Sequence, residues 1–111
     1  MEVTVFEYPG CPYCRQARQL LSELAEENPA YGAVHFHRID ETEQQALASQ
    51  YDYYRAPSFF LGRRKLYEAD PSWSEQEARR RLRSMLDALT AEGETAAEND
   101  PPRGTAPDEQ I

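Results

Sequence analysis

With 111 residues, the chain is long enough for one small domain with a modest hydrophobic core, and its net charge of −8 argues against binding to nucleic acid. No apolar run approaches the length of a transmembrane helix, and no signal peptide precedes the first expected strand. We therefore expect a cytoplasmic, monomeric protein that binds neither nucleic acid nor membranes.

The N-terminal third predicts a strand, a turn and a helix. Residues 2–8 are rich in strand-forming residues, and Pro9-Gly10 is typical of a turn. A helix is expected from about Pro12 to Glu27 because the apolar residues there keep helical spacing, and Asn28-Pro29 should end it.

The only two cysteines of the chain, Cys11 and Cys14, lie at this strand–helix junction. Such a pair, separated by two residues, is typical of a thioredoxin-like redox motif. At a helix N-terminus, unpaired N–H groups and a partial positive charge would lower the pKa of the Cys11 thiol from about 8.5 toward roughly 3.5–7.5. Cys14, one turn further, would act as the resolving thiol that attacks a mixed disulfide on Cys11.

The middle of the chain predicts a second strand at residues 33–39, followed by a short helix through about Gln50. A strand, a helix and a further strand in this order imply a parallel, right-handed crossover. Residues 51–56 form a loop that ends at Pro57.

Two short strands are expected next, at 58–61 and 65–68, around a glycine-containing turn, and together they predict a hairpin. The sequence Ser74-Glu75-Gln76-Glu77 is a capping box, which opens a last helix. Its apolar spacing stops at Gly93.

The composition changes from about Ala91. From there to the C-terminus the chain holds six acidic residues and one basic residue, and few apolar ones. Such a segment buries too little apolar surface to offset the entropy of ordering it. We therefore expect one domain at residues 1–90 and an acidic, disordered segment at residues 91–111.

The sequence Cys11-Pro12-Tyr13-Cys14 resembles the active-site motif of dithiol glutaredoxins, which belong to the thioredoxin superfamily. The four residues match that motif position by position, and the order of elements is similar over about residues 1–90. The resemblance implies an α/β, thioredoxin-like fold of the glutaredoxin type, β-α-β-α-β-β-α. Its four-stranded mixed sheet would have the order 2-1-3-4, with helices on both faces.

The resemblance also implies residues that bind substrate. Glutaredoxins and thioredoxins carry a cis proline opposite the cysteines, and Pro57 stands at that place. It would turn the backbone of Ala56 toward a cysteine-containing substrate, which would pair there like an added strand. Tyr13, between the cysteines, is a further residue expected to contact substrate. From the residues alone, Pro57 is also compatible with a proline that merely starts a strand.

Two departures from the family concern glutathione. Tyr8 stands where the family usually carries a lysine that binds a carboxylate of glutathione. Residues 68–72 (Glu-Ala-Asp-Pro-Ser) stand where most members have a Gly-Gly pair before an acidic or hydroxyl residue. Ser72 or Ser74, with the free N–H groups of the last helix, offers another place for a carboxylate.

The expected function is that of a glutaredoxin-like thiol–disulfide oxidoreductase, with Cys11 and Cys14 as its catalytic residues. Its substrates would be disulfide-containing or glutathionylated proteins. Glutathione would be the reductant and co-substrate, or, as an alternative, a thioredoxin reductase would reduce the protein directly. We expect no tightly bound cofactor and no metal.

Two further alternatives come from other classes. A structural zinc site could use Cys11, Cys14, His35 and His37, because alternation along a strand places both histidines on one face. The His-x-His spacing departs from common zinc motifs, however, and the residues between the cysteines fit a redox turn better. The other alternative is an interaction module in which the cysteines have no catalytic role.

Overall fold

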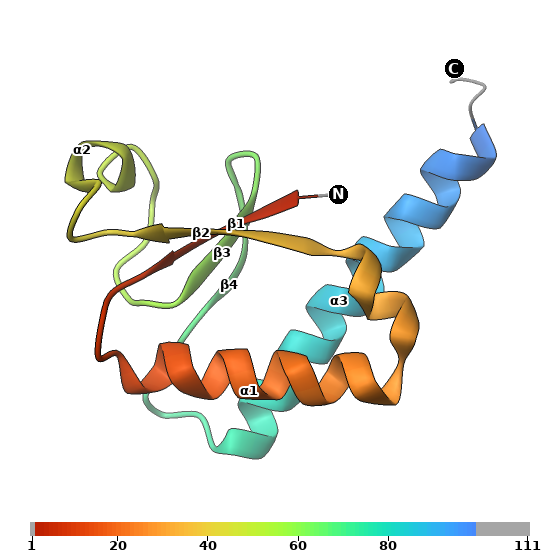
Figure 1. Ribbon diagram of the computed structural model, residues 1–111, viewed down its shortest axis with the longest axis horizontal. Coiled ribbons are helices and arrows are strands. Elements are labelled where there is room, and N and C mark those ends of the chain that lie inside the picture. The colour runs from red at the N-terminus through yellow and green to blue at the C-terminus, as the bar shows by residue number, and fades with distance from the viewer. Residues whose placement is uncertain (1, 100–111) are drawn as a thin grey trace.

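The computed structural model describes residues 2–99, with side chains through residue 91. The elements follow the predicted order, with one short helix added (Figure 1). They are β1 (Glu2–Glu7), α1 (Pro12–Glu27), the 3₁₀ helix η1 (Pro29–Ala33), β2 (His35–Asp40), α2 (Gln45–Ala48), β3 (Ser58–Leu61), β4 (Arg64–Glu68) and α3 (Glu75–Asn99).

The four strands form one mixed sheet in the order β2-β1-β3-β4, which confirms the predicted topology. β1 is parallel to β2 and antiparallel to β3, and β3 and β4 form the antiparallel hairpin. The register pairs Val5 of β1 with Arg38 of β2 on one side and with Phe59 of β3 on the other. β1 is therefore an inner strand, and its C-terminal end leads into the turn before α1.

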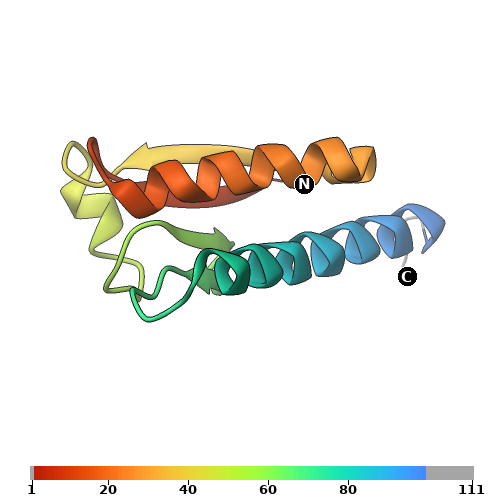
Figure 2. The same cartoon turned by 90° about the horizontal axis from the view of Figure 1, so that it is seen from below.

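Helices cover both faces of the sheet, as the resemblance implied. α1 and α3 lie side by side against one face, and α2 lies on the other (Figures 1 and 2). Successive residues of β1 point to opposite faces. Val3 and Val5 therefore pack in the core beneath α1 and α3, whereas Phe6 packs in a second core beneath α2.

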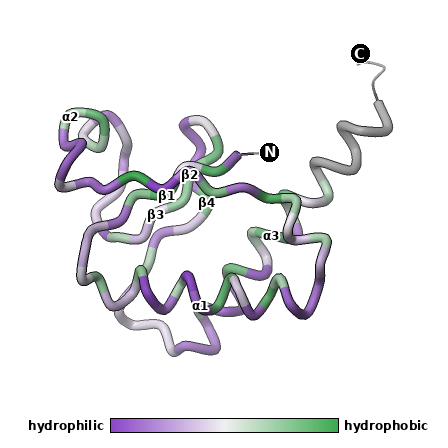
Figure 3. The backbone as a smooth tube through the Cα atoms, viewed as in Figure 1, coloured by the Kyte–Doolittle hydropathy of each residue, from purple (hydrophilic) through white to green (hydrophobic). Residues whose placement is uncertain are grey.

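The larger core lies between the sheet and the pair formed by α1 and α3. Hydrophobic residues alternate with hydrophilic ones along both helices (Figure 3), so that each helix buries one face. The residues of these two helices that are buried in this core are Ala17, Leu20, Leu21 and Leu24 of α1, and Ala78, Leu82, Met85, Leu86 and Leu89 of α3. The spacing that predicted the helices is the spacing that fills this core.

The smaller core is aromatic. The ring centroid of Phe6 lies 4.8 Å from that of Tyr51 and 5.1 Å from that of Tyr53, and Phe60 packs against all three rings. The Tyr53 hydroxyl donates a hydrogen bond to the Glu41 carboxylate at 2.7 Å. Burial and this acidic partner raise the pKa of Tyr53 above its usual value.

The chain after α1 differs from the prediction. Asn28 and Pro29 end α1 as expected, but they also begin η1, which the sequence pattern did not indicate. The Asn28 side chain caps this short helix by accepting the N–H of Ala30 at 3.2 Å. Apolar periodicity cannot indicate a single turn of this kind, because only Tyr31 within it is buried.

The last helix is longer than predicted. Its start is correct, since Ser74 Oγ accepts the N–H of Glu77 at 3.1 Å. Its apolar spacing stops at Gly93, whereas its backbone is helical to Asn99. Residues 100–111 lie outside the described residues, and the boundary between a folded domain and an acidic segment stays a prediction.

Ion pairs join α3 to α1 at the surface. Arg79 pairs with both Glu23 and Glu27 of α1, and Arg83 contacts Glu27 at 3.0 Å. Exposed pairs of this kind contribute about 0–1 kcal/mol each, so the apolar core holds the helices together and the charges orient them. Within residues 2–99, no helix has both the length and the apolar character that a membrane span requires.

Replacing Leu82 with alanine should lower the free energy of unfolding by about 2–5 kcal/mol, because a fully buried side chain would leave a cavity between α3 and the sheet. Denaturant unfolding measures the change. The matched control is Ser84→Ala on the exposed side of α3, which should change stability by less than about 0.5 kcal/mol. Equal stability of the two variants would contradict this packing.

Candidate active site

A tight turn carries the chain from β1 to α1. Gly10 has a φ of +81°, in the left-handed region that glycine adopts without steric cost. The N–H of Cys11 donates to the carbonyl oxygen of Tyr8 at 3.3 Å and closes the turn. Cys11 therefore reaches the start of α1 directly from the inner strand of the sheet.

Cys11 is the N-cap residue of α1. Its backbone is extended, and its carbonyl oxygen accepts the N–H of Arg15 at 3.1 Å. Its Sγ atom accepts the N–H of Cys14 at 3.1 Å, as the side-chain oxygen of an ordinary N-cap residue would. The sulfur thus occupies the position where unpaired N–H groups and the helix dipole stabilise negative charge.

Cys11 and Cys14 are paired with each other. They form a disulfide with their Cα atoms 5.2 Å apart, and both side chains are buried. Because two thiols at this separation can form a disulfide without moving the backbone, the pair can be oxidised and reduced within one fold. This arrangement is that of a dithiol redox site.

Ala56 and Pro57 lie beside the cysteines, and the peptide bond between them is cis, as the resemblance implied. The carbonyl oxygen of Ala56 is 3.7 Å from Cys11 Sγ, and Ala56 forms one small buried cluster with Cys11 and Cys14. Pro57 is fully buried, and its carbonyl oxygen accepts the N–H of Ala69 at 3.1 Å. The structure therefore brings these four candidate residues together.

The loop that carries Ala56 is anchored by Glu68, a residue that sequence reasoning missed. Its carboxylate accepts the N–H of Tyr54 at 2.6 Å and of Arg55 at 2.7 Å, and it pairs with Lys65 at 2.8 Å. Burial acts to raise the pKa of Glu68, but these hydrogen bonds outweigh it and hold the pKa below its usual value. The anchored N–H groups lie 14 and 13 residues away in sequence, so no local pattern reveals the contact.

Tyr13, the fifth candidate residue, borders a cleft of about 260 Å³ beside Ala56. The cleft is lined by Tyr8, Tyr13, Glu41, Tyr54, Arg55, Ala56, Ala69 and Pro71. Tyr13 and Ala56, two of the three residues predicted to contact substrate, therefore share one cleft. We call this cleft, with the lining residues just named, the tyrosine cleft.

A second cavity, of about 230 Å³, adjoins the cysteines and contains a buried acid. Glu7 is only 7% exposed and pairs with Arg18 of α1 and, at 3.2 Å, with Arg38 of β2. Cys11 and Cys14 line the same cavity. Sequence reasoning missed Glu7 as well, because its partners Arg18 and Arg38 lie 11 and 31 residues away in sequence.

The zinc site considered as an alternative is not formed. Among the side chains that the structure describes, no three histidine, cysteine, aspartate or glutamate residues gather as metal ligands would. His35 and His37 are exposed on β2. Within the described residues, the cysteine pair therefore lacks the two histidine ligands that this alternative requires.

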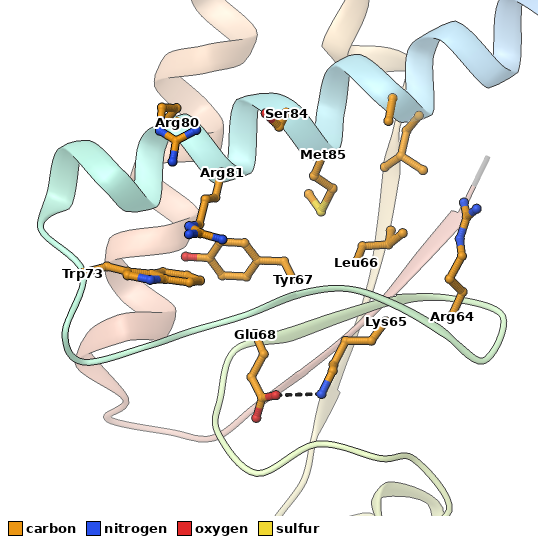
Figure 4. Close-up of a pocket in the computed structure, with 12 residues that line it drawn as sticks. Arg64, Lys65, Leu66, Tyr67, Glu68, Trp73, Arg80, Arg81, Ser84 and Met85 are labelled. Carbon is orange, nitrogen blue, oxygen red and sulfur yellow. Dashed lines mark hydrogen bonds and ion pairs between the residues drawn. The ribbon is translucent and has the colours of Figure 1, made fainter.

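A larger groove, of about 730 Å³, lies between β4 and α3 and is lined by none of the five candidate residues (Figure 4). Its aromatic and basic side chains contact one another. The Arg81 guanidinium lies over the Trp73 ring at 4.4 Å, and the Tyr67 and Trp73 ring centroids are 5.6 Å apart. These contacts join the edge strand to α3, which is a structural role.

Comparisons with known proteins agree with this geometry. The family model Glutaredoxin matches residues 3–65, more than half of the chain, and this range includes all five candidate residues. The chain is also similar to a solved structure described as "Structure of a malarial protein", with 17% identity, a TM-score of 0.50, and coverage of 77% of this chain and 96% of that chain. That likeness concerns the fold alone, and no curated protein matches. On the family match, the fold and the cysteine pair together, the chain belongs to the glutaredoxin family of thiol–disulfide oxidoreductases.

Proposed function

We propose that the protein reduces protein disulfides and glutathione mixed disulfides through Cys11 and Cys14. The observation that carries this proposal is the position of Cys11 Sγ. It caps α1, lies 3.1 Å from the Cys14 N–H, and lies 3.7 Å from the carbonyl oxygen of Ala56. A nucleophilic sulfur, a resolving thiol and a backbone group for substrate are thus adjacent.

The reaction starts from the reduced pair. The Cys11 thiolate attacks one sulfur of the substrate disulfide, which forms a mixed disulfide and releases the first substrate thiol after protonation. Cys14, as its thiolate, then attacks the Cys11 sulfur and releases the second substrate thiol. Two electrons pass to the substrate, and the protein is left with the Cys11–Cys14 disulfide that the structure contains.

The chain supports each step with a fixed group. The N–H groups at the start of α1 stabilise the Cys11 thiolate before it attacks the substrate disulfide. The Ala56 carbonyl lies next to the reacting sulfur, where the backbone of an extended substrate can pair with it. Glu68 keeps this part of the loop in place through two backbone N–H groups.

A thioredoxin reductase as the direct reductant is the second candidate, because the places proposed for glutathione carboxylates are occupied or changed. The Ser72 hydroxyl donates to the Asp70 carboxylate at 2.8 Å, and Ser74 Oγ already accepts an N–H of α3. Tyr8 offers no positive charge beside Cys11. The family generally works with glutathione and disulfide substrates, so glutathione stays the first candidate.

Consumption of NADPH during reduction of a small disulfide distinguishes the two reductants. We expect turnover with glutathione and glutathione reductase, because the cysteine geometry alone suffices to react with glutathione mixed disulfides. Turnover only with thioredoxin reductase would establish the second candidate. Absence of turnover with both systems would contradict the proposed function.

Replacing Cys11 with serine should abolish both disulfide reduction and deglutathionylation, since it removes the nucleophile. Cys14→Ser should abolish disulfide reduction but keep deglutathionylation, because glutathione can resolve the mixed disulfide on Cys11 without a second protein thiol. The two activities are measured on a small disulfide and on a glutathionylated peptide. Loss of both in the Cys14→Ser protein would show that the monothiol route is wrong.

Replacing Tyr8 with lysine should lower the KM for glutathione by about two- to fivefold, the effect of one exposed ion pair. The side chain at this position is exposed and lines the same cavity as Cys11, so a lysine ammonium can reach a bound carboxylate. Tyr8→Gln is the matched control because it shortens the side chain without adding charge. Equal KM values in the two variants would mean that glutathione does not bind near residue 8.

A further inference from the structure

We propose that the tyrosine cleft binds an apolar or aromatic side chain that neighbours the reacting cysteine of a polypeptide substrate. This inference rests on the proposed function and names the substrate class of the same site. It assigns specificity to three tyrosines: Tyr13, which was expected to contact substrate, and Tyr8 and Tyr54, which line the same cleft.

The exposed aromatic surface of the protein gathers at this cleft. Among the side chains that the structure describes, the large hydrophobic ones that are exposed are Tyr8 at 40%, Tyr13 at 40% and Tyr54 at 88%. All three line the tyrosine cleft. Single exposed hydrophobic residues are common on protein surfaces, but their convergence on one hollow marks a binding site.

The three tyrosines come from separate parts of the fold. Tyr8 follows β1, Tyr13 lies in the first turn of α1, and Tyr54 belongs to the loop before Pro57. A cleft with walls from three segments keeps its shape only if each segment is held in place. The turn at Gly10, the N-terminus of α1 and the Glu68 anchor hold them.

Tyr54 differs from the other tyrosines of its loop. Its neighbours in the loop, Tyr51 and Tyr53, pack against Phe6 in the smaller core, whereas the Tyr54 side chain points into solvent. Its backbone is nevertheless fixed, because its N–H donates to Glu68. An aromatic ring on a fixed backbone gives a large contact area and loses little conformational entropy on binding, as in antibody binding loops.

The position of the cleft decides which part of a substrate it meets. Ala56 lines the cleft, and its carbonyl oxygen lies 3.7 Å from Cys11 Sγ. Successive residues of an extended peptide are about 3.3 Å apart, so a residue next to the reacting cysteine falls within reach of the cleft. The volume of about 260 Å³ is below that of sites for drug-sized ligands, which fits one or two side chains.

The charges around the cleft favour selection by apolar surface. The lining of the cleft contains one acidic residue, Glu41, and one basic residue, Arg55, so its formal net charge is zero. The Glu41 carboxylate is also engaged by the Tyr53 hydroxyl. A substrate therefore gains more from burying an apolar side chain against the tyrosine rings than from carrying a charge of either sign.

Single-turnover reactions test the inference without any choice of reductase. The full chain is reduced with a small dithiol, desalted and mixed with symmetric disulfides of two peptides that have the same net charge. One peptide carries leucine and phenylalanine on either side of its cysteine, and the other carries serine and glutamine. Quenched thiol analysis gives the second-order rate constant for each peptide, and bis(2-hydroxyethyl) disulfide serves as a substrate without side chains.

The protein should react about three- to tenfold faster with the apolar peptide. Tyr54→Ser should bring the ratio of the two rate constants close to one, whereas Tyr54→Phe should keep it, because the ring and not the hydroxyl makes the contact. Both variants should fold, since the side chain is 88% exposed and the hydrogen bond to Glu68 comes from the backbone.

Two results would overturn the inference while the proposed function stands. One is equal reaction of the unaltered protein with both peptides, and the other is an unchanged ratio in the Tyr54→Ser protein, each with the small disulfide still reduced. If the reduced protein reacts with none of the three disulfides, the proposed function fails and the inference fails with it.

Discussion

The site depends on the N–H groups in the first turn of α1, which have no acceptor within the helix. The inner strand β1 ends beside this turn, and the reversal at Gly10 leaves Cys11 as the cap that meets these groups. Cys11 therefore ends the turn and caps α1, and its sulfur lies at the N-terminus of that helix. Any change in the direction of α1 relative to β1 would move the sulfur, which is why the buried face of α1 against the sheet serves the chemistry as well as the stability.

The opposite wall of the site depends on a different kind of contact. The loop before Pro57 has no secondary structure of its own to position it, and it would be free to move if its N–H groups faced only water. Glu68, which lies on the neighbouring strand β4, restricts this motion because its carboxylate accepts two of the loop N–H groups. The hairpin therefore fixes both the Ala56 carbonyl next to Cys11 and the tyrosine ring at the rim of the cleft. The Glu68 carboxylate therefore links the position of β4 in the sheet to the position of the loop that carries Ala56.

The parts of the structure that local sequence determines were predictable. The cysteine spacing, the bounds of α1 and the capping of α3 by Ser74 follow from residues within a few positions of one another. The sheet order came from resemblance to a family, because no local pattern states which strands are neighbours. Contacts of Glu7 and Glu68 escaped prediction because their partners lie 11 to 31 and 13 to 14 residues away in sequence. Each looks in the sequence like an ordinary surface acid.

Glu7 shows how the fold handles a charge that would otherwise oppose the reaction. A buried carboxylate in the same cavity as the cysteines would disfavour a second negative charge on sulfur, since like charges raise the pKa of an acid. The carboxylate also loses hydration at its position beneath α1, which is costly for an unpaired charge. Arg18 and Arg38 offset both effects. Their guanidinium groups balance the negative charge of Glu7, and they form the ion pairs that replace its lost hydration. The carboxylate that shares a cavity with the cysteines is therefore paired, and it opposes a negative charge on sulfur less than an unpaired carboxylate would.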